Sequence, residues 1–177
     1  MRLVLLAAVV GAALGVARRG RPLHGADRRV RLWPLLVGGL AAQLAVAMLD
    51  GGGLGVLLMS YALLVAFALA NLWTVGMWLV GLGVALNLVV IAANQGMPVR
   101  AEALVHAGVA GPQEVTALEF TAKRHLEDPH DRLTALADIV AVPALGEVIS
   151  FGDLFMSTGV AVVLAHLLRR RRSTDGP

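Results

Sequence analysis

The feature that most restricts the fold of this 177-residue chain is its longest uncharged stretch. Residues Gly51–Val99 contain no Asp, Glu, Lys or Arg, although 15% of the whole chain is charged. A helix that spans a membrane needs about 20 mostly apolar residues, so the stretch is too long for one span and suits two. Polar Asn71 lies between the two. Helices are required, because a lone strand leaves its backbone polar groups unsatisfied in lipid.

Other apolar runs predict three further spans. The five predicted spans cover residues 3–17, 32–49, 54–70, 72–93 and 151–168. The hydrophobic content of 58% agrees with a membrane protein, and the lack of cysteine excludes a disulfide scaffold. We therefore expect an all-α bundle of five transmembrane helices, with residues 1–177 forming a single membrane domain. Gly11 and Gly15, four residues apart in the first span, predict a close contact between helices.

Arginine residues set the expected orientation in the membrane. Four predicted spans separate two basic clusters, so both clusters lie on one side, which the positive-inside rule makes the cytoplasmic one. The amino terminus is then outside and the carboxyl terminus inside, in a bacterial cytoplasmic membrane. The outer side receives ten acidic residues and five basic ones. The clusters consist of Arg18, Arg19, Arg21, Arg28, Arg29 and Arg31, and of Arg169, Arg170, Arg171 and Arg172.

The arginine clusters also indicate the partners of the chain. Basic residues beside a span attract anionic lipid head groups, which we expect for Arg18, Arg19, Arg21 and the 169–172 run. No aromatic residues are interleaved among these arginines, so a nucleic-acid partner is not expected.

The outer segment, residues 94–147, is predicted to be a helical cap. Pro112 and Glu114 indicate the start of a helix that runs to Leu126 and is ended by Pro129. A second short helix is expected from Asp131 to Ile139, because its apolar residues recur at helical spacing. Such amphipathic helices would lie on the membrane surface or cover the end of the bundle.

The point where the fourth span leaves the membrane has the sequence Asn94-Gln95-Gly96-Met97-Pro98-Val99. Gly96 permits a left-handed or closely packed backbone, and Pro98 prevents the helix from continuing. The structural interpretation is a helix end with a defined turn. The functional interpretation is a polar cradle in which Asn94 and Gln95 hold an extended peptide or a head group.

A second group of polar residues comprises His125, Asp128, His130 and Asp131. A metal site needs three or four convergent ligands. Pro129 interrupts the segment, so regular helical spacing cannot bring these side chains together. We therefore expect a solvated turn, with His125 and Asp131 as candidate binding residues and with no metal or other cofactor.

Asp138 and Asp153 are the candidate catalytic residues. Carboxylates at membrane depth are energetically costly and are often functional. Two that lie close together can share a proton and activate water as an acid–base pair. The structural interpretation of Asp153 is a capping box, because Ser150 three residues earlier suits the N-cap position of the last span. For Asp138 it is an exposed helix residue.

The whole chain resembles an uncharacterised family of small bacterial membrane proteins that have about five spans. Three features carry this resemblance: the Asn94–Pro98 motif, the outer segments that contain His and Asp, and the sequence SFGDLFMSTG over Ser150–Gly159. The resemblance implies an integral membrane protein and brings no activity with it.

The stretch Asp131–Arg172 is similar in layout to the end of lipoprotein signal peptidase. Asp131-Arg132 is followed by Asp138, by Asp153 and by a basic tail. The similarity implies that Asp138 and Asp153 are the catalytic aspartates, and that Asn94 and Gly96 correspond to the Asn-x-Gly element of that family. This chain differs in placing that element after the fourth span, in having His130 where the family has a Gly-Asn pair, and in having five spans.

Two functions follow from these observations. The first is a non-enzymatic structural or accessory membrane protein, whose partner would be another membrane protein. The alternative is a membrane-embedded aspartyl hydrolase or peptidase that uses the Asp138–Asp153 pair. Gly51-Gly52-Gly53 lacks the Lys-Ser/Thr of a nucleotide-binding loop, so nucleotide chemistry is not expected.

Overall fold

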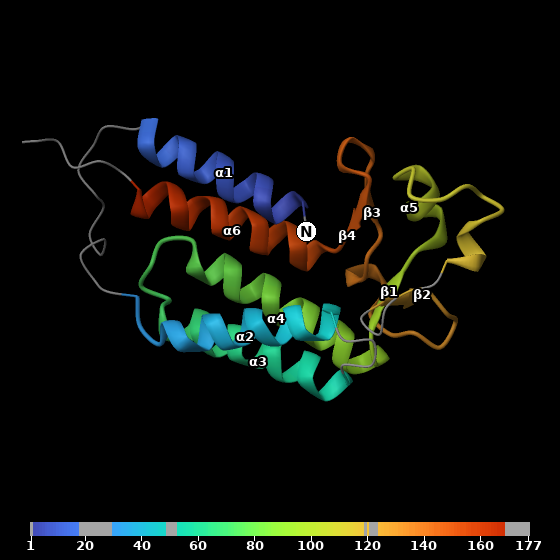
Figure 1. Cartoon of the computed structure of the whole chain (residues 1–177), viewed down its shortest axis with the longest axis horizontal. Coiled ribbons are helices and arrows are strands. Elements are labelled where there is room, and N and C mark those ends of the chain that lie inside the picture. The colour runs from blue at the N-terminus through green and yellow to red at the C-terminus, as the bar shows by residue number, and fades with distance from the viewer. Residues whose placement is uncertain (1, 18–29, 49–52, 119, 121–123, 169–177) are drawn as a thin grey trace, which may run out of the picture.

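The computed structural model describes residues 2–17, 30–48, 53–118, 120 and 124–168, and most of these residues are helical (Figure 1). Five long apolar helices form the bundle, and one lies in each stretch that the sequence predicted, which confirms the all-α class. They are α1 (Arg2–Ala17), α2 (Trp33–Met48), α3 (Leu54–Ala70), α4 (Met77–Asn94) and α6 (Phe151–Leu167).

Helix α4 begins five residues later than predicted. Residues Asn71–Gly76 form consecutive turns, and the last of them places Gly76 in the left-handed region with φ of 91°. Of the described helices, only α4 is long and apolar enough to cross a membrane by itself, with 18 residues. The other four helices of the bundle are equally apolar but have 16 or 17 residues.

The helices pack in the series α1, α6, α4, α3, α2, and every extensive contact between two of them joins neighbours in this series. Glycines permit the closest approaches. A Cβ atom at Gly11 would collide with the backbone of Ala161, and one at Gly15 would lie 2.9 Å from the carbonyl oxygen of Ala165. The predicted close contact of the first span is therefore confirmed, and its partner is α6.

The cap lies at one end of the bundle, and a turn that contains Asn71 lies at the other. Helices α1, α3 and α6 begin at the end where the cap lies, and α2 and α4 finish there (Figure 1). At the opposite end, Asn71 ties the turn before α4 to the start of α2. Its side-chain amide accepts a hydrogen bond from the Arg31 N–H and donates one to the Arg31 carbonyl, each 2.8 Å long.

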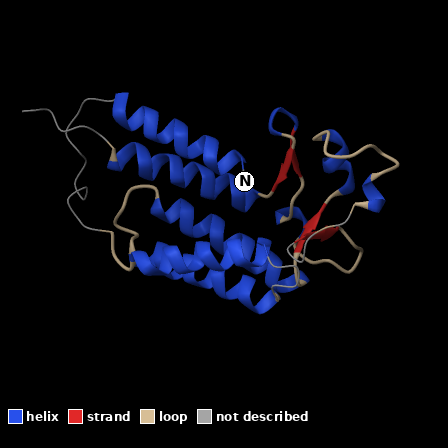
Figure 2. Cartoon of the chain, in the orientation of Figure 1, coloured by secondary structure: helices blue, strands red, loops and turns tan. Residues whose placement is uncertain are grey.

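The prediction of a helical cap is wrong for most of that segment. Helix α5 (Ala101–His106) is followed by short 3₁₀ helices and extended segments (Figure 2). Strand β1 (Met97–Val99) pairs in parallel with β2 (Arg124–Leu126), and β3 (Val140–Val142) pairs antiparallel with β4 (Glu147–Ile149). The 3₁₀ helices cover Val115–Ala117, Thr134–Leu136 and Pro143–Leu145.

In the described part of the first predicted helix, a 3₁₀ helix and strand β2 replace the α-helix for a tertiary reason. Val115 and Leu126 were expected to share one face of a helix, but each packs separately against a small core that contains Val99 and Leu104. A helix shorter than about 12 residues is marginal in water without tertiary support. Pairing of β2 with β1 therefore prevails over the local helical spacing.

The β3–β4 hairpin fixes the first turn of α1. Glu147 accepts hydrogen bonds from the backbone N–H groups of Arg2, at 2.9 Å, and of Leu3, at 3.3 Å. Partial burial acts to raise the pKa of the Glu147 carboxyl, but the charged amino group of the chain and these two backbone donors together hold the pKa below its ordinary value. The hairpin thus supplies side-chain acceptors for backbone N–H groups in the first turn of α1.

Candidate functional site

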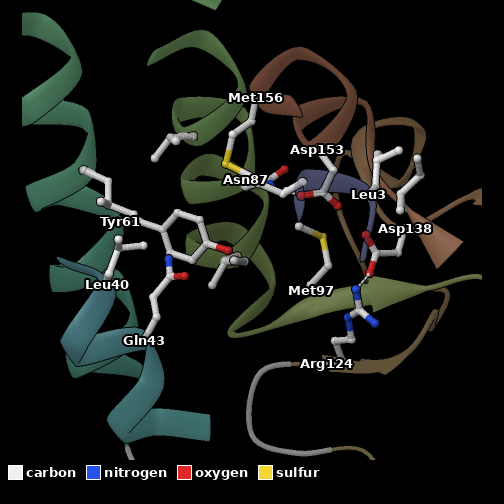
Figure 3. A pocket seen from close by; sticks show the side chains of 15 residues that line it. Leu3, Leu40, Gln43, Tyr61, Asn87, Met97, Arg124, Asp138, Asp153 and Met156 are labelled. Atoms are coloured by element: carbon white, nitrogen blue, oxygen red, sulfur yellow. Dashed lines mark hydrogen bonds and ion pairs between the residues drawn. The ribbon is translucent and has the colours of Figure 1, made fainter. Parts of the chain in front are cut away.

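The candidate site is a cavity of about 180 Å³ where the bundle meets the cap (Figure 3). All five bundle helices contribute to its wall, together with β1, β2, β4 and the segment that follows the second 3₁₀ helix. Most of the wall is apolar. The polar side chains that line it are Gln43, Tyr61, Asn87, Arg124, Asp138 and Asp153.

Strand β1 places two of these polar residues. In the register of the parallel pair, Met97 lies opposite Arg124. On the other side of β1, Val99 forms a bridge with Asp138, whose N–H donates to the Pro98 carbonyl at 3.1 Å. One strand of three residues therefore aligns two segments that are distant from it in the sequence.

This alignment brings the side chains of Arg124 and Asp138 together. Nη2 of Arg124 lies 2.9 Å from Oδ2 of Asp138, and the Asp138 side chain is 1% exposed while that of Arg124 is 43% exposed. The expectation that Asp138 is an exposed helix residue is therefore wrong. It follows a 3₁₀ helix, and its backbone pairs with β1, which turns the carboxylate into the cavity.

Asp153 enters the cavity from the first turn of α6. Ser150 and Asp153 form the predicted capping box, in which Oγ of Ser150 accepts from the Asp153 N–H at 3.0 Å and Oδ2 of Asp153 accepts from the Ser150 N–H at 3.1 Å. Asn87 on α4 adds a third partner: its Nδ2 donates to Oδ1 of Asp153 at 3.0 Å, and its Oδ1 accepts from Oγ of Ser150 at 2.9 Å.

The two candidate aspartates thus line the same cavity, although they lie on different elements (Figure 3). Asp138 faces a guanidinium, and Asp153 faces an amide and a helix N-terminus. Carboxylates in a mostly apolar cavity can hold a water molecule and exchange protons with it. Both carboxylates therefore lie where they could contact the same small molecule in the cavity.

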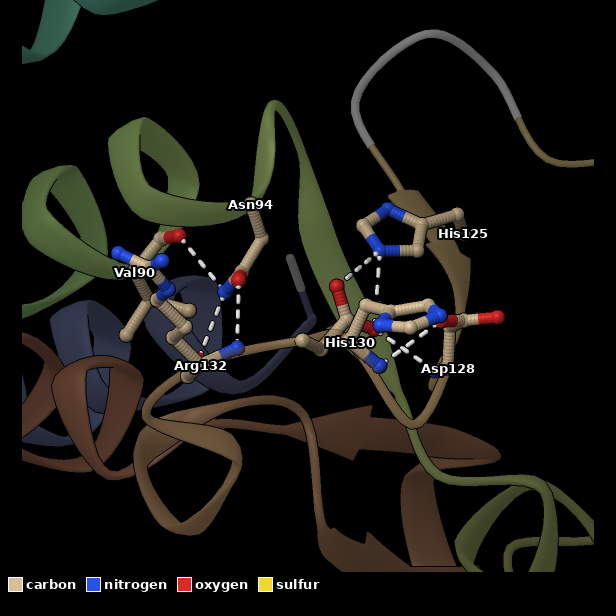
Figure 4. Close-up of polar contacts among 7 residues, drawn as sticks. Val90, Asn94, His125, Asp128, His130 and Arg132 are labelled. Atoms are coloured by element: carbon tan, nitrogen blue, oxygen red, sulfur yellow. Dashed lines mark hydrogen bonds and ion pairs between the residues drawn. The ribbon is translucent and has the colours of Figure 1, made fainter.

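The Asn94–Val99 motif holds a peptide, but the peptide belongs to this chain. Asn94 accepts a hydrogen bond from the Arg132 N–H at 2.7 Å and donates one to the Arg132 carbonyl at 2.8 Å (Figure 4). The left-handed residue of the turn is Gln95, with φ of 58°, and not Gly96, which is buried. Gln95 is exposed and does not line the cavity.

His125 and Asp131 do converge, contrary to the argument from helical spacing. Strand β2 and the following turn bring Nε2 of His125 to 3.1 Å from Oδ1 of Asp131 (Figure 4). Oδ2 of Asp131 accepts from the Asp128 N–H at 2.7 Å, so the carboxylate also closes the turn. Within the described residues, no group of three His, Asp or Glu side chains is arranged to hold a metal ion.

Some candidate residues lie elsewhere, and others were missed. The arginines expected to contact lipid, Arg18, Arg19, Arg21 and those at 169–172, lie outside the described residues. Arg124, Asn87, Tyr61 and Gln43 line the cavity but were not predicted. Three of them could have been recognised from the sequence. Gln43, Tyr61 and Asn87 are polar residues inside apolar runs, where polar groups are often functional.

Comparison with known proteins identifies the family of this chain. Comparisons with curated proteins and with solved structures gave no match. A family model, described as a family of unknown function (DUF5317), matches residues 29–165. The match includes α2, α3, α4, the whole cap and most of α6, and therefore nearly every residue of the cavity. The chain belongs to the DUF5317 family.

Proposed function

We propose that this protein is an integral membrane protein whose five long helices all lie in the bilayer. Large apolar side chains on each of the five helices are exposed, for example Leu5 at 67%, Met48 at 73% and Leu69 at 60%. Water-soluble proteins rarely leave contiguous apolar patches of this kind uncovered. A helix of 16 residues spans about 24 Å, which a locally thinned bilayer accommodates at modest cost.

We further propose that the cap and the amino terminus face the outside of a bacterial cytoplasmic membrane, and that both basic clusters and the carboxyl terminus lie inside. The charge asymmetry in the sequence supports this orientation. The chain has no cysteine, so single cysteines can report on it. In intact spheroplasts, an impermeant maleimide should label a His130→Cys variant, and it should label a Val30→Cys variant only after permeabilisation. Labelling of both before permeabilisation would refute the orientation.

For a protein with this topology, we propose that the cavity is the active site of a membrane-embedded aspartyl hydrolase. The observation that carries the proposal is that Asp138 and Asp153, separated in sequence and held by different elements, line one cavity. The similarity of Asp131–Arg172 to the end of lipoprotein signal peptidase agrees with it. Either aspartate would serve as the base, and the other would serve as the acid.

The reaction follows from these groups. One carboxylate takes a proton from a bound water as the water oxygen attacks a substrate carbonyl carbon. The other carboxyl group, protonated, donates its proton to the leaving group as the bond breaks. Arg124 offsets one negative charge of the pair, and Asn87 keeps the Asp153 carboxylate in place. The water hydroxyl ends in the carboxylic acid product, and the water proton stays on the aspartate that acted as base. The other aspartate has given its proton to the leaving group, so atoms and charge balance and the two aspartates have exchanged protonation states.

Hydrolysis is tested with the protein reconstituted in vesicles that contain a fluorogenic acyl ester or a fluorogenic lipid-linked peptide. We expect Asp138→Asn and Asp153→Asn each to lower turnover by about 100-fold or more, the usual effect of removing an acid or base. Asp128→Asn is the matched control, because Asp128 lies outside the cavity and asparagine keeps the oxygen that accepts from the His130 N–H. Equal turnover in all three variants would refute the proposal.

A second function, a non-enzymatic accessory role with another membrane protein as partner, is favoured by a specific observation. Both oxygens of Asp153 accept hydrogen bonds that shape the start of α6, and Asp138 pairs with Arg124. Both carboxylates therefore also have structural roles. Wild-type protein that hydrolyses neither probe, together with Asn variants that lose stability, would support this role over the hydrolase.

A further inference from the structure

Among the described helices, none closes the side of the cavity between α1 and α2. Helices α1 and α2 are the two ends of the packing series, and neither packs extensively on the other. Both nevertheless line the cavity, α1 through Leu3 and Val4 and α2 through Leu40 and Gln43. The cap covers one end of the bundle, so the side between α1 and α2 is where the cavity reaches the outer surface of the bundle.

The side chain of Leu40 supports this location of the opening. It lines the cavity and is also 51% exposed, so one residue belongs both to the cavity wall and to the outer surface of α2. The neighbouring surface is apolar, with Leu44 on α2 at 55% and Leu5 on α1 at 67% exposed. An opening framed by such side chains suits an acyl chain and excludes a polar solute.

The polar and apolar parts of the cavity lie on different elements. The charged groups, Arg124, Asp138 and Asp153, come from the cap and from the first turn of α6, whereas the residues from α1 and α2 are apolar apart from Gln43. As formal charges these groups sum to one net negative charge, or to zero when one aspartate carries the proton that the proposed reaction uses. In neither state does the site present a net positive charge that would hold an anionic head group, so a zwitterionic or uncharged one is favoured.

We propose that a zwitterionic or uncharged membrane amphiphile reaches this cavity sideways through the opening between α1 and α2. Its polar head lies beside Arg124, Asp138 and Asp153, and its acyl chain leaves through the opening into the bilayer. The proposal names the substrate class of the proposed hydrolase site and rests on that function only for what happens to the ligand after binding. The binding itself requires no chemistry.

The test uses photoreactive lipids. Protein is reconstituted in vesicles that contain a phosphatidylcholine probe with a diazirine close to its glycerol backbone, and cross-links are located by mass spectrometry after illumination. Met97 and Ile91 line the cavity but are 5% and 1% exposed, so bilayer lipid outside the cavity does not reach them. We expect labelling at these residues, and weaker labelling with an anionic phosphatidylglycerol probe of the same design.

A matched pair of variants locates the opening. Leu40→Trp places a larger ring in the opening and should lower labelling at Met97 by about fivefold or more, because the ring occupies the space through which the acyl chain passes. Val37→Trp adds the same ring on the same helix at a site that is 53% exposed and does not line the cavity, and labelling should stay unchanged. Labelling that is absent in the wild type, or unaffected by Leu40→Trp, would overturn the proposal.

The outcomes separate this proposal from the proposed function. Labelling with the expected pattern and no hydrolysis of either fluorogenic probe would keep the lateral opening and remove the hydrolase. Hydrolysis that depends on both aspartates, without labelling at Met97 or Ile91, would keep the hydrolase and remove the lateral opening.

Discussion

Exchanging Arg124 for glutamine is expected to lower the free energy of unfolding by about 3 kcal/mol, because it removes the positive charge that faces a buried carboxylate. Asp138 is 1% exposed and cannot move its charge to solvent without unpairing from β1. Removing the other partner of the ion pair, by Asp138→Asn, should lower the free energy of unfolding by only about 1 kcal/mol. The 43% exposed Arg124 guanidinium can turn toward water when its partner loses its charge.

The difference between the stability losses of Arg124→Gln and Asp138→Asn is measured by thermal unfolding of the purified protein in detergent. The double variant Arg124→Gln with Asp138→Asn removes both charges and leaves two amides that can pair. It should therefore be more stable than Arg124→Gln alone, which a double-mutant cycle reports as a coupling energy. Equal losses in the two single variants, or purely additive losses in the double variant, would contradict the assigned ion pair.

The bundle was predictable from the sequence because it depends on the length and apolarity of single segments. Residues 54–70 and 151–168 contain no proline that would interrupt a helix, and α3 and α6 follow them within one residue. The cap was not predictable in the same way. Strand β1 pairs with β2, which lies 27 residues later in the chain, and local spacing carries no information about such a partner.

The candidate site was predictable only for those residues that stand out individually in the sequence. Asp138 and Asp153 attract attention singly, since each is a carboxylate beside an apolar run. Arg124 is one of 15 basic residues, and nothing in its neighbourhood marks it as the partner of Asp138. Only the register of β1 with β2 places it there. Asn94 binds the backbone of Arg132 in the same chain, so the structure gives it a role inside the fold, and the predicted binding of a separate peptide or head group stays a prediction.

The contact between α4 and α6 leads to the second large effect. Gly83 on α4 faces the backbone of α6 so closely that an added Cβ would collide with the Gly152 carbonyl oxygen and would lie 2.9 Å from Cβ of Met156. Backbone atoms cannot turn aside as a flexible side chain can. Gly83→Ala should therefore destabilise the protein by about 3 kcal/mol, at the upper end for overpacking, although alanine favours helices.

The control for Gly83→Ala is the same exchange at Gly55 on α3, where no atom lies within 4 Å of the added Cβ. Here the higher helix propensity of alanine acts alone, so Gly55→Ala should raise stability by about 0.5 kcal/mol. Opposite signs in thermal unfolding are the expected result. Because Gly152 and Met156 flank Asp153, Gly83→Ala should also displace that carboxylate and lower hydrolysis of the fluorogenic probes. Stability that is unchanged by Gly83→Ala would show that α4 and α6 do not approach this closely. The hydrogen bond between Asn87 on α4 and Asp153 on α6, which depends on this approach, would then be contradicted as well.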